Sequence, residues 1–489
     1  MRSTARSRPA VGYLPFDFAI TDWLHCQAVE NGINWFRGLF VDVRQCQAIS
    51  LFHQPSITMK RREFLRYGTG IAAASLTWEA VAQTAVPVES KKVRLAVCGT
   101  GNRGTGLMRT LLTFPDVDVV AVCDLVQAAA ERAAKFCVDA GKAAPTIYAD
   151  DEGAWKKLLE TEKIDLALVA SGWPTHAANS LAALEKGVYV GCEVPIATSV
   201  EDCWKLVETS ERTKTPCMML ENWSFRQDNL AVLNMIRLGL LGEMMHAHCA
   251  YSHDGRGSFW YTRNGEERWH VQYFKKYNRN YYPTHALGPV LSWLDINAGD
   301  RFTEIYSVAT AAKGVNYRAK QLFGPDHPGS TTKFPQGDVV TSILKTALGK
   351  TVVLNLDMQL PRPYANRWMV QGTKGIYDEE KGSIYLEGVS PKPSQWEPWE
   401  PYQEKYNHRF WKEQYLGGHG GTDDCTLRQW VDAVAAKGPA PLDVYDSVTM
   451  SAVVELSGRS IAENRPVEFP DFTKGAWKTR QPYFALDQG

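Results

Sequence analysis

One stretch decides the fold: Val-Arg-Leu-Ala-Val-Cys-Gly-Thr-Gly-Asn-Arg-Gly, at residues 93–104. Alternating and apolar residues at its start predict a buried strand, and apolar residues at helical spacing over 107–112 predict a helix after it. Between them Gly99, Gly101 and Gly104 form the pattern G-x-G-x-x-G. The first glycine permits a tight turn, the second lets the backbone approach a pyrophosphate, and the third lets the helix pack closely on the strand. Because free N–H groups and the positive end of the helix dipole face that turn, the stretch predicts a dinucleotide site.

A second strand supports this interpretation. Residues 119–124 read Val-Val-Ala-Val-Cys-Asp, so an apolar run ends in Asp124, 25 residues after Gly99. A carboxylate at an offset of roughly 20 residues binds the ribose hydroxyls of NAD. The same carboxylate repels a 2′-phosphate, which favours NAD over NADP as the cofactor. An ordinary strand–helix turn without a ligand is the alternative interpretation.

Length and composition exclude several classes of protein. The chain has 489 residues, enough for two domains with sizeable cores. Lys plus Arg and Asp plus Glu are equal at 54 each, so the charge favours neither nucleic acid nor an acidic membrane surface. The 16 Trp, 20 Tyr and 18 Phe offer faces that can stack on sugar rings, although most aromatic residues lie in cores. Ten Cys without a CxxC pair predict neither a metal site nor a disulfide framework, and Cys98, Cys123 and Cys192 are expected to be small buried residues.

The first ninety residues carry the pattern of an export signal. Residues 59–66 read Met-Lys-Arg-Arg-Glu-Phe-Leu-Arg, and a short apolar run follows that is too short to span a bilayer. Ala-Val-Ala at 80–82 has the small-x-small form of a cleavage site. We therefore expect a twin-arginine signal peptide at 59–82 and a periplasmic or otherwise exported protein; a basic surface helix is the alternative. Residues 1–58 are then expected to be a non-native N-terminal extension, translated from a misplaced start.

After a polar linker at 83–90, strands and helices alternate from residue 91 to about 216. Residues 164–170 and 188–192 read as further buried strands, and 177–186 reads as a helix that Gly187 ends. This alternation predicts an α/β fold, an N-terminal Rossmann domain with a doubly wound parallel sheet. Ligands bind such a sheet at the carboxyl ends of its strands, and four loops are expected to converge there on one dinucleotide: 99–104, Asp124, 171–176 and 193–195.

The pattern changes after residue 217. Alternating strands follow a helix at 229–238, with turn-like glycines between them. These features predict a C-terminal α+β domain at 217–478 with a largely antiparallel open sheet, followed by a tail at 479–489. A helix at 443–463 is expected to pack back near the first domain. The expected strands include 246–251, 339–344, 351–356 and 367–371.

Three segments of the first domain resemble the Gfo/Idh/MocA oxidoreductases. They are 98–104, the Trp-Pro-Thr-His at 173–176 and the Cys-Glu-Val-Pro at 192–195. In that superfamily the last segment is usually Glu-Lys-Pro, and its lysine assists proton transfer while a carbinol is oxidised. Val194 stands at that position here. The resemblance therefore argues against an ordinary sugar or inositol dehydrogenase.

The departure at Val194 points to one branch of the superfamily. Across residues 91–478 the chain resembles glycoside hydrolase family 109, the NAD-dependent α-N-acetylgalactosaminidases. Two positions differ from that branch: the family has Arg after a Trp where this chain has Trp269-His270, with Arg268 before the Trp, and Met where this chain has Thr422. Either Arg268 substitutes for the family arginine or His270 takes a different role. The matching segments are 201–204, 219–222, 251–254, 282–289, 362–364, 418–423, 441–446 and 470–473.

The resemblance implies the cofactor, the site residues and the chemistry. NAD would oxidise carbon 3 of a sugar transiently, the group at carbon 1 would leave by elimination, and water addition and re-reduction would complete the cleavage. No added metal is implied. With the glycine turn, the cofactor contacts expected are Gly99, Gly101, Asn102, Arg103, Gly104, Asp124, Trp173, Pro174, Thr175, His176, Glu193, Val194 and Asn222. The substrate contacts expected are Tyr251, Arg268 or His270, Tyr282, Pro283, Thr284, His285 and Tyr364.

Within this set, three residues are candidates for proton transfer. His285 is the expected base, because histidine titrates near neutral pH. Tyr282 and Tyr251 are candidates for proton shuttling or for stabilising an enolate. A structural histidine and plain packing of the tyrosines are the alternatives. His419 and Asp423 lie in a glycine-rich loop that either closes over the pocket or is simply flexible.

Two other functions remain open from the sequence. One is a periplasmic sugar dehydrogenase or sugar oxidoreductase that recycles a tightly held cofactor. The other is a non-catalytic sugar-binding relative, since a fold alone does not imply catalysis. All three functions imply a small-molecule or glycan substrate, no nucleic acid and no membrane span. Homo-oligomers are common in the superfamily, and the resemblance leaves one open here.

Overall fold

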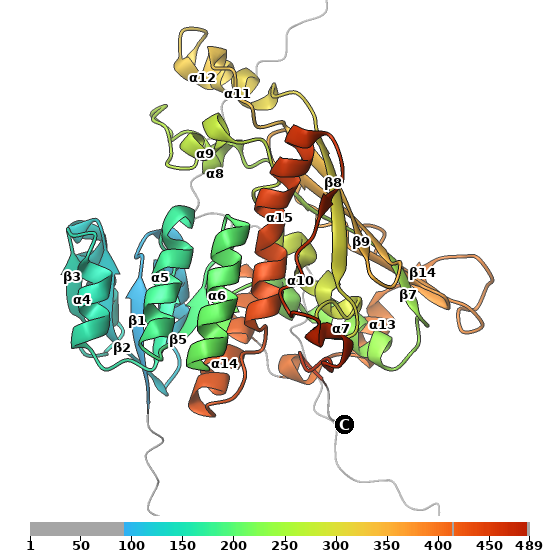
Figure 1. Cartoon of the computed structure of the whole chain (residues 1–489), viewed down its shortest axis with the longest axis horizontal. Coiled ribbons are helices and arrows are strands. Elements are labelled where there is room, and N and C mark those ends of the chain that lie inside the picture. Colours follow the sequence, from blue (N-terminus) through green and yellow to red (C-terminus); the bar gives the residue numbers. More distant parts are fainter. Residues whose placement is uncertain (1–91, 413–414, 487–489) are drawn as a thin grey trace, which may run out of the picture. The chain divides into compact units, whose positions relative to one another are not determined.

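The structure, a computed structural model, describes residues 92–412 and 415–486, which Figure 1 draws in colour. The predicted extension at 1–58, the signal peptide at 59–82 and the linker at 83–90 lie outside these residues, as do the last three residues of the chain. Among the described residues, no helix is both long enough and apolar enough to cross a bilayer.

The first part of the chain forms a six-stranded sheet whose neighbouring strands are all parallel. Its strand order, β3-β2-β1-β4-β5-β6, is that of a doubly wound nucleotide-binding sheet, which confirms the predicted α/β fold. The elements are β1 (Val93–Cys98), α2 (Asn102–Leu112), β2 (Val117–Asp124), α3 (Gln127–Asp139), β3 (Thr146–Ala149), α4 (Ala154–Thr161), β4 (Leu166–Val169), α5 (Trp173–Glu185), β5 (Tyr189–Cys192), α6 (Val200–Thr213) and β6 (Cys217–Met219).

The decisive stretch folds as its residues require. β1 is buried along nearly all its length, and Leu107 and Leu111 of α2 are buried against the sheet. A Cβ atom at Gly104 would lie 1.9 Å from the carbonyl oxygen of Gly99, so only glycine allows α2 to start this close to the strand. The third glycine of the motif therefore has the packing role that the pattern predicts.

Three differences from the expected elements have local causes. α5 begins at Trp173 rather than at 177, because Pro174 fits the first turn of a helix, where its missing N–H needs no partner. β3 is a short edge strand with exposed residues at its start, so it lacks a continuous apolar run. β6 has only three residues and lies just beyond 216, the expected domain boundary. Strands this short give no periodic signal.

The second part of the chain forms a nine-stranded sheet in the order β14-β13-β12-β11-β7-β10-β9-β8-β15. Only β7 and β10 pair in parallel, so the sheet is largely antiparallel, as predicted. Its strands are β7 (Met244–Ser252), β8 (Phe302–Ala309), β9 (Val339–Thr346), β10 (Thr351–Asp357), β11 (Met369–Gly372), β12 (Gly375–Asp378), β13 (Ser383–Leu386), β14 (Glu397–Pro398) and β15 (Val467–Glu468).

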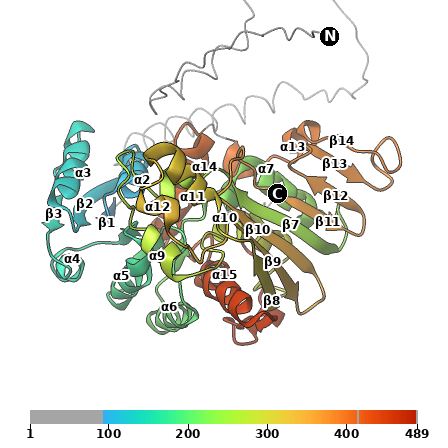
Figure 2. The same cartoon turned by 90° about the horizontal axis from the view of Figure 1, so that it is seen from above.

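Helices of this second part pack on its sheet, chiefly α10 on β7 and α15 on β8, and also reach the first sheet (Figure 2). They are α7 (Gln227–Arg237), α8 (Arg256–Phe259), α9 (Val271–Lys276), α10 (Thr284–Trp293), α11 (Gly314–Phe323), α12 (Pro328–Thr331), α13 (Glu400–Lys405), α14 (Thr422–Ala435) and α15 (Val444–Glu463), with 3-10 turns η1 (Asn222–Phe225), η2 (Arg409–Trp411), η3 (His419–Gly421) and η4 (Ala476–Lys478).

Two of these helices join the two sheets. In Figure 1, α5, α6 and α15 stand side by side. The helix α14 packs against α2, and Figure 2 shows both on the other side of the parallel sheet. On α15, the Ser447 hydroxyl accepts from the Met219 N–H of β6 at 2.9 Å, and the Ser451 hydroxyl accepts from the Ile196 N–H at 3.2 Å. The expected helix at 443–463 therefore does pack against the first domain.

Candidate active site and nucleotide site

The glycine turn leaves room at its centre and none at its ends. Gly99 has φ +92°, and a Cβ there would lie 2.5 Å from the Ser171 nitrogen. Gly101 faces open space, and the first turn of α2 has no side-chain cap. The backbone N–H groups at the start of α2, including that of exposed Asn102, therefore point to a space that an anion can enter. This geometry fits the pyrophosphate of a dinucleotide.

Asp124 ends β2 beside this turn. Its Oδ2 accepts from the Thr100 N–H at 2.6 Å and from the Thr100 hydroxyl at 2.9 Å, and its Oδ1 accepts from the Val126 N–H at 2.9 Å. These donors fix the carboxylate at the carboxyl end of the strand while leaving acceptor capacity on both oxygens. A fixed anion at this place fits ribose hydroxyls as ligands.

The segment at the start of α5 is tied to the neighbouring loops. The ring nitrogens of His176 each lie 2.8 Å from a backbone carbonyl oxygen, one of Pro195 and the other of Ser171. Burial lowers the pKa of His176. Thr175 bonds the carbonyl of Gly172 at 3.0 Å, and Trp173 is buried. His176 therefore joins two loops of the nucleotide edge, while Pro174 opens the helix.

Arg103, on the first turn of α2, binds two carboxylates. Its Nε donates to Glu193 at 2.6 Å, and its two Nη atoms donate to the Asp423 oxygens at 2.7 and 3.0 Å. Asn222 Nδ2 also donates to Asp423, at 2.9 Å. Although burial opposes the shift, hydrogen bonds from His419 and Arg103 hold the pKa of Asp423 well below its usual range. Five predicted cofactor or loop positions therefore meet in one polar cluster.

Two further residues at this edge, Val194 and Thr422, carry no charge, unlike most members of the cluster. Val194 is 2 % exposed and apolar, so the position where the superfamily carries lysine supplies no proton-transfer group here. Thr422 donates to the His419 carbonyl oxygen at 3.0 Å and accepts from Asn222 at 3.2 Å. A methionine at residue 422 could not form either bond.

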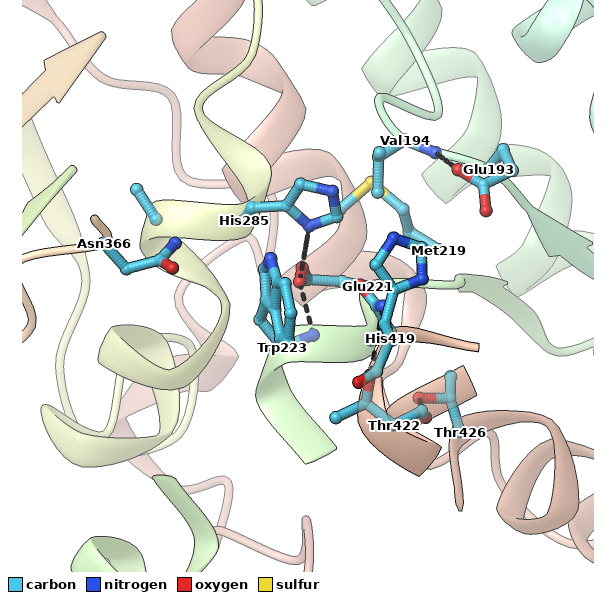
Figure 3. Close-up of polar contacts among 12 residues, drawn as sticks. Glu193, Val194, Met219, Glu221, Trp223, His285, Asn366, His419, Thr422 and Thr426 are labelled. Carbon is cyan, nitrogen blue, oxygen red and sulfur yellow. Dashed lines mark hydrogen bonds and ion pairs between the residues drawn. The ribbon is translucent and has the colours of Figure 1, made fainter. Parts of the chain in front are cut away.

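His285 and Glu221 form the central pair of the second cluster (Figure 3). Nδ1 of His285 lies 2.9 Å from Oε1 and 3.2 Å from Oε2 of Glu221, whose side chain is fully buried. The same Oε1 accepts from the Trp223 N–H at 2.8 Å. Because an ionised carboxylate only accepts hydrogen bonds, the neutral tautomer that fits this pair has the proton on Nδ1 and the lone pair on Nε2. Among the described residues, Nε2 has no hydrogen-bond partner, so it is available to a substrate.

Aromatic rings surround this pair. Tyr251 stacks on Tyr282 with ring centroids 4.8 Å apart, and both rings lie about 5 Å from the His285 ring, at 5.0 and 5.1 Å. Tyr364 contacts Tyr251 edge-on at 6.0 Å and is 47 % exposed. Trp223 closes the cluster between Tyr364 and His285. The structure thus brings together four residues that the sequence assigned to substrate.

The tyrosines of the cluster keep their phenolic protons. Burial raises the pKa of Tyr251 well above its ordinary value, and burial raises the pKa values of Tyr282 and Tyr364 in the same direction. Each hydroxyl is therefore a hydrogen-bond donor at neutral pH. Donors of this kind stabilise negative charge that develops on a substrate oxygen.

The remaining predicted substrate residues lie at the border of this cluster. Pro283 caps α10 and Thr284 is its first residue, with the threonine fully buried. His270 stacks on Trp269 at 3.6 Å and reaches Tyr282 only through Trp173 and Phe259.

Arg268 and His270, the two alternatives at the position of the family arginine, differ in charge. Burial lowers the pKa of His270 to about 3, so its ring is neutral at physiological pH. Arg268 donates to the Tyr261 carbonyl oxygen at 3.4 Å and remains a cation, since guanidinium does not deprotonate in proteins. His270 therefore cannot replace the charge of an arginine.

Sequence reasoning assigned no role to Glu221 and Trp223. Glu221 lies two residues after the end of β6, at the edge where ligands bind a parallel sheet, and an acid at that place is a signal that could have been used. Its pairing with His285 depends on α10, which begins more than sixty residues later. Trp223 carried no signal beyond its residue type.

Solved structures that superpose on this chain include NAD-binding oxidoreductases and dehydrogenases. An NAD-binding oxidoreductase from Klebsiella pneumoniae superposes with a TM-score of 0.60 at 16% identity, covering 78% of this chain and 100% of that one. Levoglucosan dehydrogenase in complex with NADH and levoglucosan superposes with a TM-score of 0.57 at 17% identity, with the same coverage. At this identity the likeness establishes the fold alone.

Sequence comparison identifies the family. Residues 93–221 match the model of the oxidoreductase family with an NAD-binding Rossmann fold, and residues 225–479 match that of the glycosyl hydrolase 109 C-terminal domain. A glycosyl hydrolase family 109 protein of Stenotrophomonas maltophilia is 41% identical over 453 residues, 88% of this chain and 99% of the relative. An alpha-N-acetylgalactosaminidase of Tannerella forsythia is 36% identical over 465 residues, 87% and 99% of the two chains. The chain therefore belongs to glycosyl hydrolase family 109 and is a glycoside hydrolase built on an NAD-binding Rossmann domain.

Proposed function

We propose that this enzyme cleaves an α-N-acetylgalactosaminide-type bond by a redox and elimination route in which NAD is held and reused. The observation that carries the proposal is the His285–Glu221 pair, which leaves one imidazole nitrogen unpartnered inside a ring cluster next to the nucleotide edge. An ordinary glycosidase instead places two carboxyl groups about the scissile bond. Glu221 is bound to His285 and to the Trp223 N–H, so it is not placed as a free acid.

The cofactor would be held by the groups that fit it. The N–H groups at the start of α2 would bind the pyrophosphate, Asp124 the ribose hydroxyls, and the loops at the ends of β4 and β5 the remainder. The fixed carboxylate of Asp124 favours NAD over NADP. When bound, NAD supplies a reversible hydride acceptor for carbon 3 of the sugar.

His285 would move the proton at carbon 2. A ketone at carbon 3 makes that hydrogen acidic, so a neutral imidazole can remove it at Nε2. The imidazolium formed is stabilised by Glu221, which holds the Nδ1 proton at 2.9 Å. Loss of the group at carbon 1 follows, and the same imidazolium can return the proton after water has added.

Tyr251 and Tyr282 would stabilise the charge that develops on the carbon 3 oxygen. Both phenols stay protonated, because burial raises their pKa values, and their stacked rings lie beside His285. Preorganised donors at such an oxygen contribute about 3 kcal/mol each to lowering a barrier. Tyr364, half exposed at the edge of the cluster, would contact the sugar.

The sugar assigned rests on the relatives. The protein of Tannerella forsythia carries the name alpha-N-acetylgalactosaminidase and matches most of this chain. Val194 weighs against the alternative of a sugar dehydrogenase, because a buried valine cannot exchange a proton at the position used by the lysine of that class. A non-catalytic sugar-binding role would leave the unpartnered nitrogen of His285 without a purpose.

We also propose that the enzyme is exported through the twin-arginine pathway. The support is the sequence Met-Lys-Arg-Arg-Glu-Phe-Leu-Arg at 59–66, followed by a short apolar run and Ala-Val-Ala. This pathway carries folded proteins, so the cofactor can be bound before export. N-terminal sequencing of the extracytoplasmic protein should find a start after residue 82, and changing Arg61 and Arg62 to Lys should keep the protein inside the cell.

Assays of glycoside cleavage and of NADH formation on the same purified protein separate the three functions. Purified protein should release p-nitrophenol from p-nitrophenyl α-N-acetylgalactosaminide without added NAD and without net NADH. Stoichiometric NADH formed from a free sugar would favour the dehydrogenase. Neither activity across a broad panel of sugars would leave the non-catalytic role.

A further inference from the structure

The guanidinium of Arg103 is committed to protein carboxylates. Its Nε binds Glu193 and its two Nη atoms bind both oxygens of Asp423, at 2.6, 2.7 and 3.0 Å. The acid side chains are 9 % and 6 % exposed, while that of Arg103 is 32 % exposed. One guanidinium thus pairs with two buried carboxylates, so the net charge of the three side chains is negative. Arg103 is therefore placed to fix acids rather than to neutralise a phosphate.

Each partner comes from a different segment of the nucleotide edge. Arg103 lies on the first turn of α2, Glu193 directly follows β5, and Asp423 is the second residue of α14. Asn222, just after β6, donates to Asp423 at 2.9 Å, and His419 Nδ1 lies 2.9 Å from the same carboxylate. Figure 3 shows His419 and Thr422 beside Trp223 and Glu221, which links this cluster to the catalytic pair.

Asp423 is the member that joins the α14 segment to the nucleotide loop. Fork-to-fork bonding between guanidinium and carboxylate fixes both distance and orientation, unlike a single ion pair. Without this carboxylate, Arg103 and Glu193 would keep one bond, and the first turn of α2 would keep only the longer contact of Arg103 Nη1 with His419 Nδ1, at 3.4 Å, as its tie to the His419 loop. The positive φ values of His419, Gly420 and Gly421, from +54° to +90°, define a tight turn that presents Asp423 to Arg103.

We propose that Asp423 is a positioning residue for the cofactor: through Arg103 it fixes the glycine turn and the His419 loop in the arrangement that keeps NAD bound between turnovers. The inference rests on the proposed function, in which the cofactor is reused and need not leave. It extends that function by assigning retention to a residue of the second domain. Asp423 would act on NAD through Arg103 and the backbone of α2, without being required to touch it.

The chain contains a matched control for this pair. Arg428, on the same helix α14, donates to Asp116 through both Nη atoms at 2.9 and 2.8 Å. Asp116 directly precedes β2, so this second fork joins α14 to the amino end of the parallel sheet, opposite to the nucleotide edge. Asp116→Asn and Asp423→Asn each remove a two-point bond between α14 and the first domain, but only one bond lies at the glycine turn.

The test compares these two isosteric variants in the full-length protein. NAD per chain is measured after gel filtration, and the rate of NAD release is followed by its displacement with labelled NAD. The expected result for Asp423→Asn is release at least about tenfold faster than wild type, since an amide cannot accept both guanidinium bonds. Arg103→Lys should release NAD faster as well, because an ammonium lacks the fork. Asp116→Asn should retain NAD as the wild type does.

Thermal unfolding with and without added NAD separates retention from folding. A lower melting temperature that excess NAD restores in Asp423→Asn, but not in Asp116→Asn, supports the positioning role. Equal release rates in both variants, or wild-type release in Asp423→Asn, would overturn it. If wild-type protein carries no NAD, the proposed retention fails, and titration decides the inference: the Kd for NAD should rise about tenfold in Asp423→Asn only. An unchanged Kd would contradict it.

Discussion

Nδ1 of His285 lies 2.9 Å from Oε1 of Glu221, although the two residues stand on separate elements: His285 at the start of α10 and Glu221 immediately before the turn η1. The carboxylate is fully buried and also accepts the Trp223 N–H, so it has a fixed position. The pair fixes the orientation of the imidazole through Nδ1 and leaves Nε2 without a hydrogen-bond partner among the described residues. The groups that the proposed route needs, a base with a carboxylate that orients it and phenolic donors, are therefore present without a second free carboxyl group.

Replacing Glu221 by Gln should lower kcat by about 10² to 10⁴, because an amide no longer enforces the productive tautomer or stabilises the imidazolium. NAD content should stay near that of the wild type. The measurement is kcat for release of p-nitrophenol, with NAD per chain determined on the same sample. Glu379→Gln is the matched control, because that acid also accepts a backbone N–H, from Trp368, but does not contact His285. Wild-type turnover in Glu221→Gln would remove the orienting role.

Replacing Asp124 by Ala should weaken NAD retention, because the ribose hydroxyls lose their acceptor. We expect NAD per chain after dialysis to fall, and discrimination against NADP to fall with it. Asp118→Ala is the control on the same strand, since Asp118 pairs with Lys92 rather than facing the glycine turn. Unchanged cofactor content in Asp124→Ala would argue against the ribose contact.

Replacing Asp446 by Asn should stabilise the protein above neutral pH. Burial raises the pKa of Asp446 to about 8, with Asp443 adding to the shift. An unfolded aspartate ionises near pH 4, so between about pH 4 and 8 the folded state binds more protons and the free energy of unfolding falls as pH rises. The amide of the Asp446→Asn variant does not titrate, so it removes this loss, and its oxygen can still accept the bond from Asn297.

The variant should therefore gain about 1 to 3 kcal/mol at pH 8 and almost nothing near pH 4. The measurement is the free energy of unfolding from denaturant titrations at both values of pH. A gain of equal size at both would show that the effect does not come from titration of Asp446.

Replacing Tyr364 by Ala should raise KM more than it lowers kcat. Its ring is half exposed and contacts Tyr251 and His253, so it lies at the open side of the cluster, away from the Nε2 proton transfer. Loss of a sugar contact that is equal in ground and transition states changes binding alone. Steady-state kinetics of Tyr364→Ala and Tyr364→Phe test this, and a large loss of kcat with unchanged KM would place Tyr364 in the chemistry instead.

The parts of the fold that were predictable are local in sequence. The glycine turn, the strand that ends in Asp124 and the alternation of strands and helices each depend on residues within a few positions of one another. The change of pattern after residue 217 predicted the second domain, and the resemblance to the family, confirmed by the comparisons, grouped Tyr251, Tyr282 and His285. Short edge elements such as β3 and β6 were not predictable, because three or four residues show no period.

The pairings that define the site were also beyond local reasoning. Glu221 pairs with His285, 64 residues away in the sequence, and Arg103 pairs with Asp423, 320 residues away. Each depends on how α10 or α14 packs against the parallel sheet, which no local pattern specifies. The charge of His270 could not be predicted from the sequence either, because its pKa depends on burial among Trp269, Phe259 and Trp173.

The most direct test of the redox and elimination route is cleavage of p-nitrophenyl α-N-acetylgalactosaminide in D₂O, with the released sugar examined by NMR. The account predicts deuterium at carbon 2, retention of the original hydrogen at carbon 3, and loss of both cleavage and exchange in His285→Ala. A sugar released at full speed with hydrogen still at carbon 2 would contradict it.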